Sequence, residues 1–486
     1  MNTSRNYFLL FLAGVLFHLI GTWNLPLIDR DEPRFAEASR EMRARADWIV
    51  PYFNGQYRFD KPPLTYWAQV ASYGLFGEND FAARFPSAIA AGLTAVALLA
   101  WGTRIANRRT GWWAAVIFSL SLQTFVHAKA AVADMWLVLF MTTAHWGGYE
   151  WLVHPMKRSC SSVSEPRPQW WVAFFASLAL AFLAKGPIGL LPLIPAIWVL
   201  TKGGSLRKGM AFAGGLLLTV AIICLWAVPA LFQTHGEFFR VGIGRHVIGR
   251  SLGAMEGHGA KSAGVYLLLL PFYLIVVFLS FFPWSYKLPW LFRQMRSHRD
   301  FADNYLLWGI VTIFGVFTLV ATKLPHYTLP AFPLLSLILA RRWSRITTER
   351  NSGASVFSVV AIVAAAVWIA AALIVPPLTA KQFPSHALFW ETREYLRPEM
   401  QFASVDFTEP SLVWYFRSKL NTYLTPIRRG KAAQFMSGAG PRLIVLPTQK
   451  AAAVFPTIPQ EWKRVETSGF NIPKGQRVDL TLLLKE

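Results

Sequence analysis

The polar residues best suited to chemistry form one run, Asp29-Arg30-Asp31-Glu32-Pro33-Arg34, directly after a first apolar segment. Carboxylates and guanidinium groups crowded beside a membrane-like segment are costly unless they pair with each other or bind a ligand. Two interpretations stay open. Asp31 or Glu32 caps the helix that follows, with Pro33 in its first turn. Alternatively, one carboxylate faces a cavity and acts as a general base or stabilises a developing positive charge.

Three lysines stand beside prolines and apolar runs: Lys61, followed by Pro62-Pro63, Lys185 and Lys323. In the simplest interpretation these lysines lie in surface turns or extend their ammonium groups to the membrane interface. The segment 233–263 adds three more bases, Arg240, Arg245 and Arg250. Ammonium and guanidinium groups gathered on one face bind a phosphate and stabilise it as its charge grows, so the pattern predicts a phosphate site.

Asp134 begins an apolar stretch, where a carboxylate is usually functional or paired. Pairing with Lys129 or with a neighbouring helix is the structural alternative to a catalytic role. His246 and His326 are candidates for metal ligands together with Asp60. The chain contains neither HExxH nor a Cys/His spacing typical of zinc sites, so the sequence alone gives this metal site little support.

The composition indicates a membrane protein. Of 486 residues, 54% are hydrophobic and 15% are charged, and the formal net charge is +22; an ordinary soluble domain has about 25% charged residues. Uninterrupted apolar runs such as residues 88–102 and 356–375 exclude a basic nucleic-acid-binding protein. The two cysteines, Cys160 and Cys224, cannot form a disulfide framework.

Eleven segments are predicted to span the membrane as helices, because backbone groups in lipid must bond internally. They are residues 7–25, 82–103, 111–127, 132–153, 170–184, 187–201, 210–232, 264–285, 304–322, 324–340 and 355–378. The first has no signal-peptide cleavage site and is interpreted as a retained anchor. Lys and Arg dominate alternate short connections, which the positive-inside rule places in the cytoplasm. The loop 26–81 and the C-terminal hundred residues then lie outside it.

The two extracytoplasmic parts differ in pattern. The loop 26–81 contains a charged amphipathic helix over 32–45 and an apolar helix over 63–76, which is too short to span and is expected to lie in the interface. From residue 381, strand-like runs alternate with helical ones, typical of a small α/β domain. The predicted organisation is therefore a transmembrane catalytic domain over 1–380 and a soluble domain over 381–486.

Several motifs together resemble the bacterial aminoarabinose transferase family. They are Asp31-Glu32-Pro33-Arg34-Phe35-Ala36-Glu37, Lys61-Pro62-Pro63-Leu64, Ala133-Asp134-Met135, Ala184-Lys185-Gly186-Pro187 and Lys323-Leu324-Pro325-His326-Tyr327. Members of this family are glycosyltransferases that use polyprenyl-phosphate sugars, have the GT-C fold and are related to protein O-mannosyltransferases. The resemblance covers nearly the whole membrane part, whereas the C-terminal domain matches loosely.

The resemblance implies roles for individual residues. Asp31 matches the proposed catalytic carboxylate, with Glu32 beside it, and Asp134 matches an Asp at the membrane entry. Residues implied at the donor phosphate are Lys61, Lys185, Tyr327 and either Arg245 or Arg250; Arg34 and Lys323 are further candidates for this phosphate site. Asp60 stands where many relatives have Glu, and with His246 it is implied in a metal contact. No cofactor is otherwise required.

The expected activity is an inverting transfer of a sugar, an aminoarabinose-like pentose or a hexose, from undecaprenyl phosphate. The expected acceptor is lipid A or lipopolysaccharide at the periplasmic face of the bacterial inner membrane, and the expected protein is a monomer without a nucleic-acid partner. A phosphate monoester leaves without protonation, so one key carboxylate is enough, whereas a glycosidase employs two. Alternatives are transfer to protein hydroxyls or another surface glycan. A flippase for lipid-linked sugars is a further alternative, although inverted repeats typical of transporters are not recognisable.

Overall fold

The structure, a computed structural model, describes all residues except 1–2, 154–167, 204, 250–262, 298 and 351–352. Contacts between residues divide the chain into two compact units. The first unit consists of Met1–Leu19, Phe59–Thr65 and Pro86–Ile369, and the second of Ile20–Arg58, Tyr66–Phe85 and Ala370–Glu486. Most of the predicted outer loop is thus grouped with the C-terminal region, and the predicted domain boundary at residue 380 stays a prediction.

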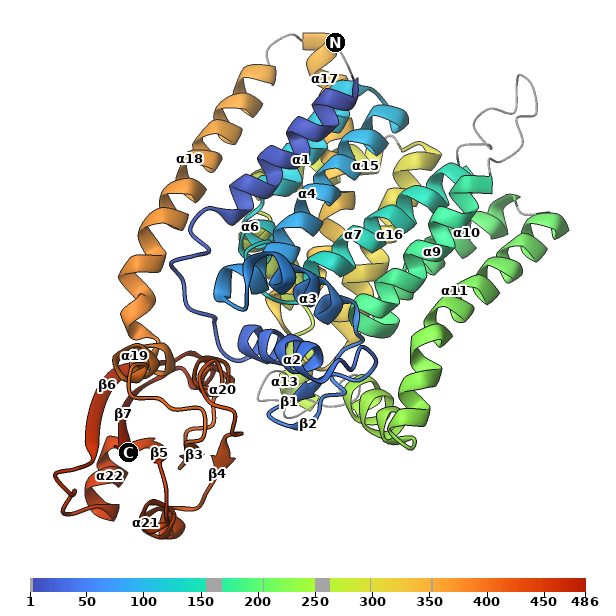
Figure 1. The fold of residues 1–486 in the computed structure, drawn as a ribbon. Coiled ribbons are helices and arrows are strands. Elements are labelled where there is room, and N and C mark those ends of the chain that lie inside the picture. The colour runs from blue at the N-terminus through green and yellow to red at the C-terminus, as the bar shows by residue number, and fades with distance from the viewer. Residues whose placement is uncertain (1–2, 154–167, 204, 250–262, 298, 351–352) are drawn as a thin grey trace. The chain divides into compact units, whose positions relative to one another are not determined.

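The first unit is built of helices (Figure 1). Its α-helices are α1 Thr3–Leu19, α5 Arg108–Leu120, α6 Leu122–His127, α7 Asp134–Gly148, α9 Pro168–Lys185, α10 Leu193–Gly203, α11 Leu206–Gln233, α13 Ala263–Leu268, α14 Phe272–Ser280, α15 Leu288–Ser297, α16 Phe301–Leu319 and α17 Phe332–Arg350. The 3₁₀- and π-helical segments are η1 Tyr149–Val153, η2 Gly186–Leu190, η3 Phe238–Gly249, η4 Trp284–Lys287 and η5 Pro325–Ala331. Helices α4 Asp80–Ile105 and α18 Gly353–Thr379 belong partly to each unit.

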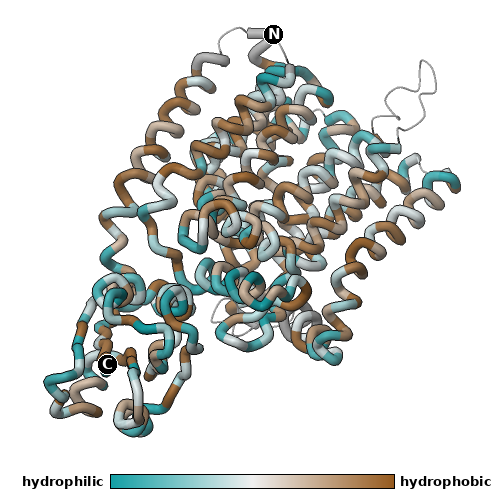
Figure 2. The backbone as a smooth tube through the Cα atoms, viewed as in Figure 1, coloured by the Kyte–Doolittle hydropathy of each residue, from teal (hydrophilic) through white to brown (hydrophobic). Residues whose placement is uncertain are grey.

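The long helices are apolar enough to lie in lipid, as the hydropathy colouring in Figure 2 shows. Five helical segments of the described chain are long and apolar enough to cross a membrane. They are Asp80–Ile105, Pro168–Leu190, Leu206–Gln233, Phe301–Leu319 and Val356–Gln382. Helices α11 and α18 leave most of their apolar side chains exposed, which costs little where the solvent is hydrocarbon. The membrane character is therefore supported, while the count of eleven spans stays a prediction.

Glycines let α7 and α9 approach closely. A Cβ atom added at Gly147 of α7 would lie 2.8 Å from the backbone nitrogen of Phe174 in α9. A Cβ atom at Gly148 would lie 2.7 Å from the hydroxyl of Tyr305 in α16. Small residues at such crossings allow van der Waals contact between backbones, which is the main source of helix association in lipid.

We predict that Gly147→Ala destabilises the protein by about 1–3 kcal/mol, because the added methyl group meets backbone that cannot move away. Gly214→Ala in α11 is the matched control, since nothing lies within 4 Å of its added Cβ. The control gains about 0.5–1 kcal/mol from the better helix propensity of Ala. Thermal unfolding in detergent measures both, and equal midpoints for the two variants would contradict the close crossing.

Buried charges join α16 to α17. Asp300 and Asp303 form a capping box at the start of α16. The guanidinium group of Arg341 binds both carboxylates, and that of Arg342 binds Asp303. Asp303 and Arg341 are almost fully buried, where an unpaired charge would cost several kcal/mol. These pairs therefore fix the start of α16 against the middle of α17.

The second unit combines helices with a mixed sheet (Figure 1). The outer loop gives α2 Asp31–Arg45, the hairpin β1 Tyr52–Phe53 and β2 Gln56–Tyr57, and α3 Leu64–Phe76, whose first two residues belong to the first unit. The C-terminal part gives η6 Ala380–Gln382, α19 Pro384–Thr392, β3 Gln401–Ser404, α20 Pro410–Phe416, β4 Thr425–Pro426, η7 Arg429–Lys431, α21 Ala432–Ser437, β5 Arg442–Pro447, α22 Thr448–Val454, β6 Lys463–Asn471, η8 Ile472–Lys474 and β7 Gln476–Lys485. The predicted helices over 32–45 and 63–76 and a C-terminal α/β pattern are thereby confirmed.

The sheet has the strand order β4-β3-β5-β7-β6. Strands β3, β4 and β5 are parallel, whereas β7 pairs antiparallel with β5 and β6. The central strand β5 is buried on both faces, and its side chains pack with α21, α22 and β7 in one core. The edge strand β6 mostly alternates between partly buried and exposed residues. Such positions accept polar side chains, so β6 lacks the apolar run by which the other strands were recognised in the sequence.

Candidate functional site

A cavity of about 320 Å³ lies within the first unit. Apolar side chains form most of its wall, and two lysines and one carboxylate enter it at one part. The lining residues are Phe59, Asp60, Lys61, Pro62, Phe182, Lys185, Gly186, Pro187, Ile188, Leu191, Trp226, Phe238, Gly242, Val316, Phe317, Val320, Thr322 and Tyr327. A wall of this kind suits a ligand that has an apolar chain and an anionic end.

Lys185 is the last residue of α9, where the chain turns through Gly186 at φ +79°. Its Nζ lies 2.6 Å from Oδ1 of Asp134, the first residue of α7, and 5.6 Å from the ring centre of Tyr327. Both partners of the ion pair are largely buried. Asp134 is thus paired with a neighbouring helix, as one interpretation of the sequence proposed. Lys129, the other partner considered, instead donates to the carbonyl groups of Phe17 and His18.

Lys61 reaches the same cavity from the segment before α3. Its Nζ lies 3.1 Å from both Oδ1 and the carbonyl oxygen of Asp60. The neighbouring Pro62 and Pro63 restrict the backbone and hold the lysine in this direction. Lys61, Lys185 and Tyr327 are therefore brought together by one cavity, as the phosphate-site prediction requires.

Lys323 does not line this cavity, and its role at the donor phosphate stays a prediction. Its Nζ donates to the carbonyl oxygens of Phe317, Thr318 and Val320 at the end of α16. The three N–H groups of the ammonium group match these three carbonyl acceptors, so Lys323 satisfies all its hydrogen-bond donors at the C-terminal end of α16. The sequence placed Lys323 beside the motif but could not show where α16 ends.

Some predicted residues lie outside the described part. Arg250 has no described structure, and the side chains of Arg245 and His246 in η3 are not described either. The predicted metal contact between Asp60 and His246 thus stays a prediction. Arg240, also in η3, is exposed, and Cys160 lies in the undescribed segment 154–167.

In the second unit, Asp31 and Glu32 have different surroundings. Both carboxylate oxygens of Glu32 bind the buried guanidinium group of Arg84, at 2.9 and 2.7 Å, and one also accepts from the backbone N–H of Ile28. Glu32 is therefore held in a buried ion pair with Arg84, and its prediction as a catalytic residue stays a prediction. Asp31 is exposed at the first residue of α2 and makes no hydrogen bond or ion pair with the residues that the structure describes.

The capping interpretation of this run is also corrected, because the N-cap of α2 is Arg30 and no side chain caps it. Asp31 lies in the first turn, where the helix dipole favours a negative charge. Arg34 is partly buried in the same turn and exerts an electrostatic influence on Asp29. Among the described carboxylates of this run, Asp31 is the one left to act on a ligand.

Asp29 is a residue that sequence reasoning left without a role. Burial raises the pKa of Asp29 from 3.8 to about 7, although the backbone N–H and the hydroxyl of Ser411 donate to its carboxylate. Its partner stands 382 positions later in the chain. The only available signal was its place in the run of charges, since contacts at that separation are invisible in a sequence pattern.

We expect the ionisation of Asp29 to make the free energy of unfolding depend on pH. Because its folded pKa exceeds 3.8, the folded chain keeps a proton between about pH 4 and pH 7 that the unfolded chain has lost. The free energy of unfolding therefore falls as pH rises through this window, by at most about 1.4 kcal/mol per pH unit. Asp29→Asn keeps an acceptor for Ser411 and should remove this slope. Thermal midpoints of both proteins between pH 4.5 and 8 measure it, and parallel curves would contradict the assignment.

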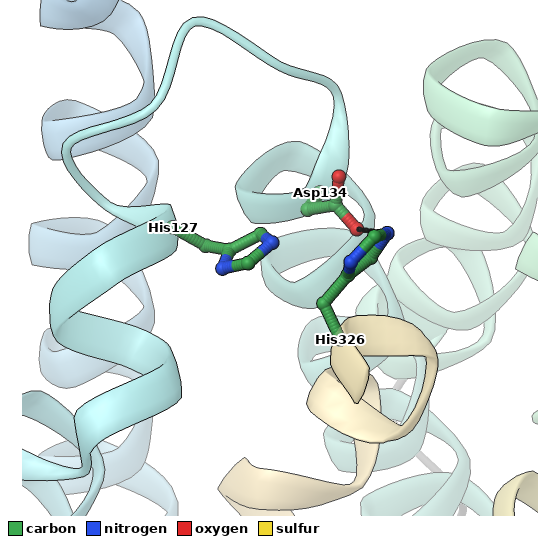
Figure 3. A group of neighbouring side chains, drawn as sticks. All are labelled: His127, Asp134 and His326. Carbon is green, nitrogen blue, oxygen red and sulfur yellow. Dashed lines mark ion pairs between the residues drawn. The ribbon is translucent and has the colours of Figure 1, made fainter. Parts of the chain in front are cut away.

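A second polar cluster in the first unit consists of His127, Asp134 and His326, from the end of α6, the start of α7 and η5 (Figure 3). Their candidate ligand atoms all lie within 4.8 Å of one another. Nε2 of His326 is 4.0 Å from Oδ1 of Asp134. The sequence suggested His326 as a metal ligand but with different partners. It gave no signal for His127, because residues 127 and 326 are far apart in the sequence and come together only in the folded structure.

Comparison with known proteins finds a family model and several relatives that match this chain. The family model described as dolichyl-phosphate-mannose-protein mannosyltransferase matches residues 60–227, which include Lys61, Asp134 and Lys185. An uncharacterised protein of Aquifex aeolicus is 30% identical over 69% of this chain and 73% of its own length. The undecaprenyl phosphate-alpha-4-amino-4-deoxy-L-arabinose arabinosyl transferase of Edwardsiella ictaluri is 28% identical over 72% of this chain. That alignment covers 62% of the Edwardsiella protein, so the chain spans less than two thirds of its length.

The fold has a solved counterpart. The crystal structure of ArnT from Cupriavidus metallidurans bound to undecaprenyl phosphate superposes with a TM-score of 0.78. The superposition covers 99% of this chain and 98% of the other, at 18% sequence identity. Such a likeness at low identity establishes the helical architecture together with the small C-terminal sheet.

Proposed function

Because this chain belongs to the aminoarabinose transferase-like family of GT-C glycosyltransferases, we propose that it transfers a sugar from a polyprenyl phosphate to an acceptor outside the cytoplasm. The observation that carries the proposal is the cavity of the first unit, where Lys61 and Lys185 enter a mostly apolar wall. A polyprenyl phosphate has the complementary structure, with an isoprenoid chain attached to an anionic phosphate. Undecaprenyl phosphate, which the Cupriavidus structure contains, is the donor lipid proposed here.

The two lysines are held by carboxylates, Lys61 by Asp60 and Lys185 by Asp134. A phosphate entering the cavity accepts hydrogen bonds from both ammonium groups in place of those carboxylates. Such charge-assisted hydrogen bonds strengthen as negative charge develops on the leaving phosphate. The lysines therefore bind the donor and also stabilise the transition state.

In the proposed mechanism, the acceptor attacks the anomeric carbon with inversion and the C–O bond to the lipid phosphate breaks. The phosphate monoester leaves as a stable anion, so it needs no proton from a general acid. Asp31 is the proposed catalytic carboxylate, which takes the proton of an acceptor hydroxyl or stabilises its positive charge. Its exposed position at the first residue of α2 is compatible with access by an acceptor.

The proposed acceptor is lipid A, at the periplasmic face of the bacterial inner membrane, and the proposed sugar is an aminoarabinose-like pentose or a hexose. The name of the Edwardsiella relative supports an aminoarabinose-like sugar. The protein is proposed to work as a monomer and without a required cofactor. Transfer to protein hydroxyls is the second candidate, favoured by the mannosyltransferase family model over residues 60–227.

Acceptor dependence separates these candidates from a flippase. Purified protein with undecaprenyl phosphate-aminoarabinose should release undecaprenyl phosphate only when an acceptor is added, because the lipid phosphate is the leaving group. Lipid A and a hydroxyl-rich peptide are offered separately, and mass spectrometry identifies the modified product. Movement of the lipid-linked sugar across vesicles without any release would contradict a transferase.

Lys61→Ala should raise KM for the lipid donor by about 10–100-fold, because it removes a charge-assisted hydrogen bond worth about 1.5–3 kcal/mol. Lys202→Ala is the matched control, since this lysine is exposed at the end of α10 and does not line the cavity. Initial rates at varied donor concentration give the comparison. An unchanged donor KM in Lys61→Ala would remove this lysine from the phosphate site.

Asp31→Asn should reduce kcat at least about 100-fold, because the amide cannot accept a proton at neutral pH. Since Asp31 makes no contact with the described residues, the variant should keep the wild-type thermal midpoint. Glu391→Gln in α19 is the control for loss of an exposed carboxylate. Full transfer activity in a folded Asp31→Asn protein would refute the catalytic role.

A further inference from the structure

The cluster of His127, Asp134 and His326 has the composition of a transition-metal site. Two imidazoles and one carboxylate are ligands that Zn²⁺ and similar borderline cations prefer, whereas Mg²⁺ and Ca²⁺ prefer oxygen ligands. Three protein ligands also leave a fourth position open, which is typical of zinc sites that accept water or a substrate. The cluster uses none of the residues of the predicted Asp60 and His246 contact.

The geometry is close to that of a bound cation. Figure 3 shows the two imidazole rings and the carboxylate directed toward a common space between three segments. Ligand atoms on a tetrahedral Zn²⁺ ion stand about 3.3 Å apart, given bond lengths of about 2.0–2.1 Å. The candidate atoms here lie within 4.8 Å of one another, and the Asp134 to His326 distance is 4.0 Å. Side-chain rotations that move each atom by about an ångström would complete the site.

The surroundings hold these ligands in place. Nδ1 of His127 lies 2.9 Å from the side-chain amide nitrogen Nε2 of Gln123, one helical turn earlier in α6. Turning this amide over exchanges its oxygen and nitrogen; the oxygen then accepts the Nδ1 proton and the Nε2 lone pair of His127 points outward, the usual arrangement of a histidine that binds metal. The connection between α6 and α7 is fixed as well, because the hydroxyl of Ser87 donates to the carbonyl of Ala130 and Lys129 binds two carbonyls of α1.

Two ammonium groups oppose a cation here, because both Lys185 and Lys61 act electrostatically on His326, Lys185 more strongly. Nζ of Lys185 lies 2.6 Å from Oδ1 of Asp134, so the ammonium group already neutralises the carboxylate. A carboxylate has about four lone-pair sites and can serve two partners, but two cations on one carboxylate repel each other. A metal ion must therefore compete with Lys185 for Asp134.

We infer that His127, Asp134 and His326 form a binding site for a divalent cation of the zinc class, and that this cation shares or replaces Lys185 on Asp134. The site joins three segments that are far apart in the sequence, α6, α7 and η5. A bound ion therefore stabilises the folded first unit, and removal of the competing ammonium group strengthens binding.

Zinc itself is the probe. Full-length protein in detergent, freed of its affinity tag and stripped with a chelator, is titrated with Zn²⁺, and with Co²⁺ for its visible spectrum. We expect one equivalent per chain and a zinc-dependent rise in the thermal midpoint. His127→Asn, His326→Asn and Asp134→Asn should each weaken affinity about 10–100-fold, and Lys185→Met should strengthen it about tenfold or more. His235→Asn, at an exposed histidine outside the cluster, should bind zinc as the wild type does.

Three outcomes would overturn the inference. The first is the absence of zinc binding. The second is zinc binding that survives in the His127, His326 and Asp134 variants but is lost in Asp60→Asn. The third is a weaker zinc affinity in Lys185→Met. Gel filtration and the thermal midpoint without metal establish that each variant is folded, and the two histidine variants serve if Asp134→Asn unfolds. Because metal binding is measured directly, the result stands whatever the outcome of the transfer assays.

Discussion

The central physical constraint on this molecule is that a charge within an apolar, helical environment must have a partner. The ion pair of Asp134 and Lys185 shows this most directly, since it joins the first residue of α7 to the last residue of α9 inside a largely apolar unit. Taking either group out of water alone costs several kcal/mol. The carboxylate therefore makes it possible for a lysine to line the cavity before any anion is bound there. A ligand phosphate, in this view, exchanges one anion for another and leaves no ammonium group uncompensated.

The same constraint explains several other buried charges that the structure describes. Arg84 holds Glu32, Arg341 holds Asp300 and Asp303, and the buried Glu37 of α2 binds Arg40 together with Arg417. Except for Glu37 with Arg40, which both lie in α2, each of these pairs joins one element to another, which gives the carboxylates a structural role. Asp31 differs because it is exposed and has no partner among the described residues. The pairing of its neighbours therefore narrows the choice of the catalytic group.

Many helices and strands could be predicted from the sequence, because they depend on the residues of one local segment. Apolar composition identified helices such as α4, α11 and α18, and the short helices α2 and α3 of the outer loop followed from amphipathic or apolar runs of limited length. Strands β3, β5 and β7 were visible as buried runs, whereas the exposed edge strand β6 was not. Of the residues predicted at the donor phosphate, Lys61, Lys185 and Tyr327 line one cavity, whereas Lys323 bonds to carbonyls at the end of α16. The difference depends on where α16 ends, and an apolar run defines its own ends poorly.

The sequence by itself determined the membrane character, the position of many helices and the residues worth testing, because hydropathy and motif spacing are local properties of the chain. Only the tertiary structure decided which charges neutralise each other. Asp134 and Lys185 are 51 positions apart, and Asp29 and Ser411 are 382 positions apart. Which carboxylate is paired and which is left to react depends on these long-range contacts, since the cost of burying a charge is set by what packs beside it and not by its neighbours along the chain.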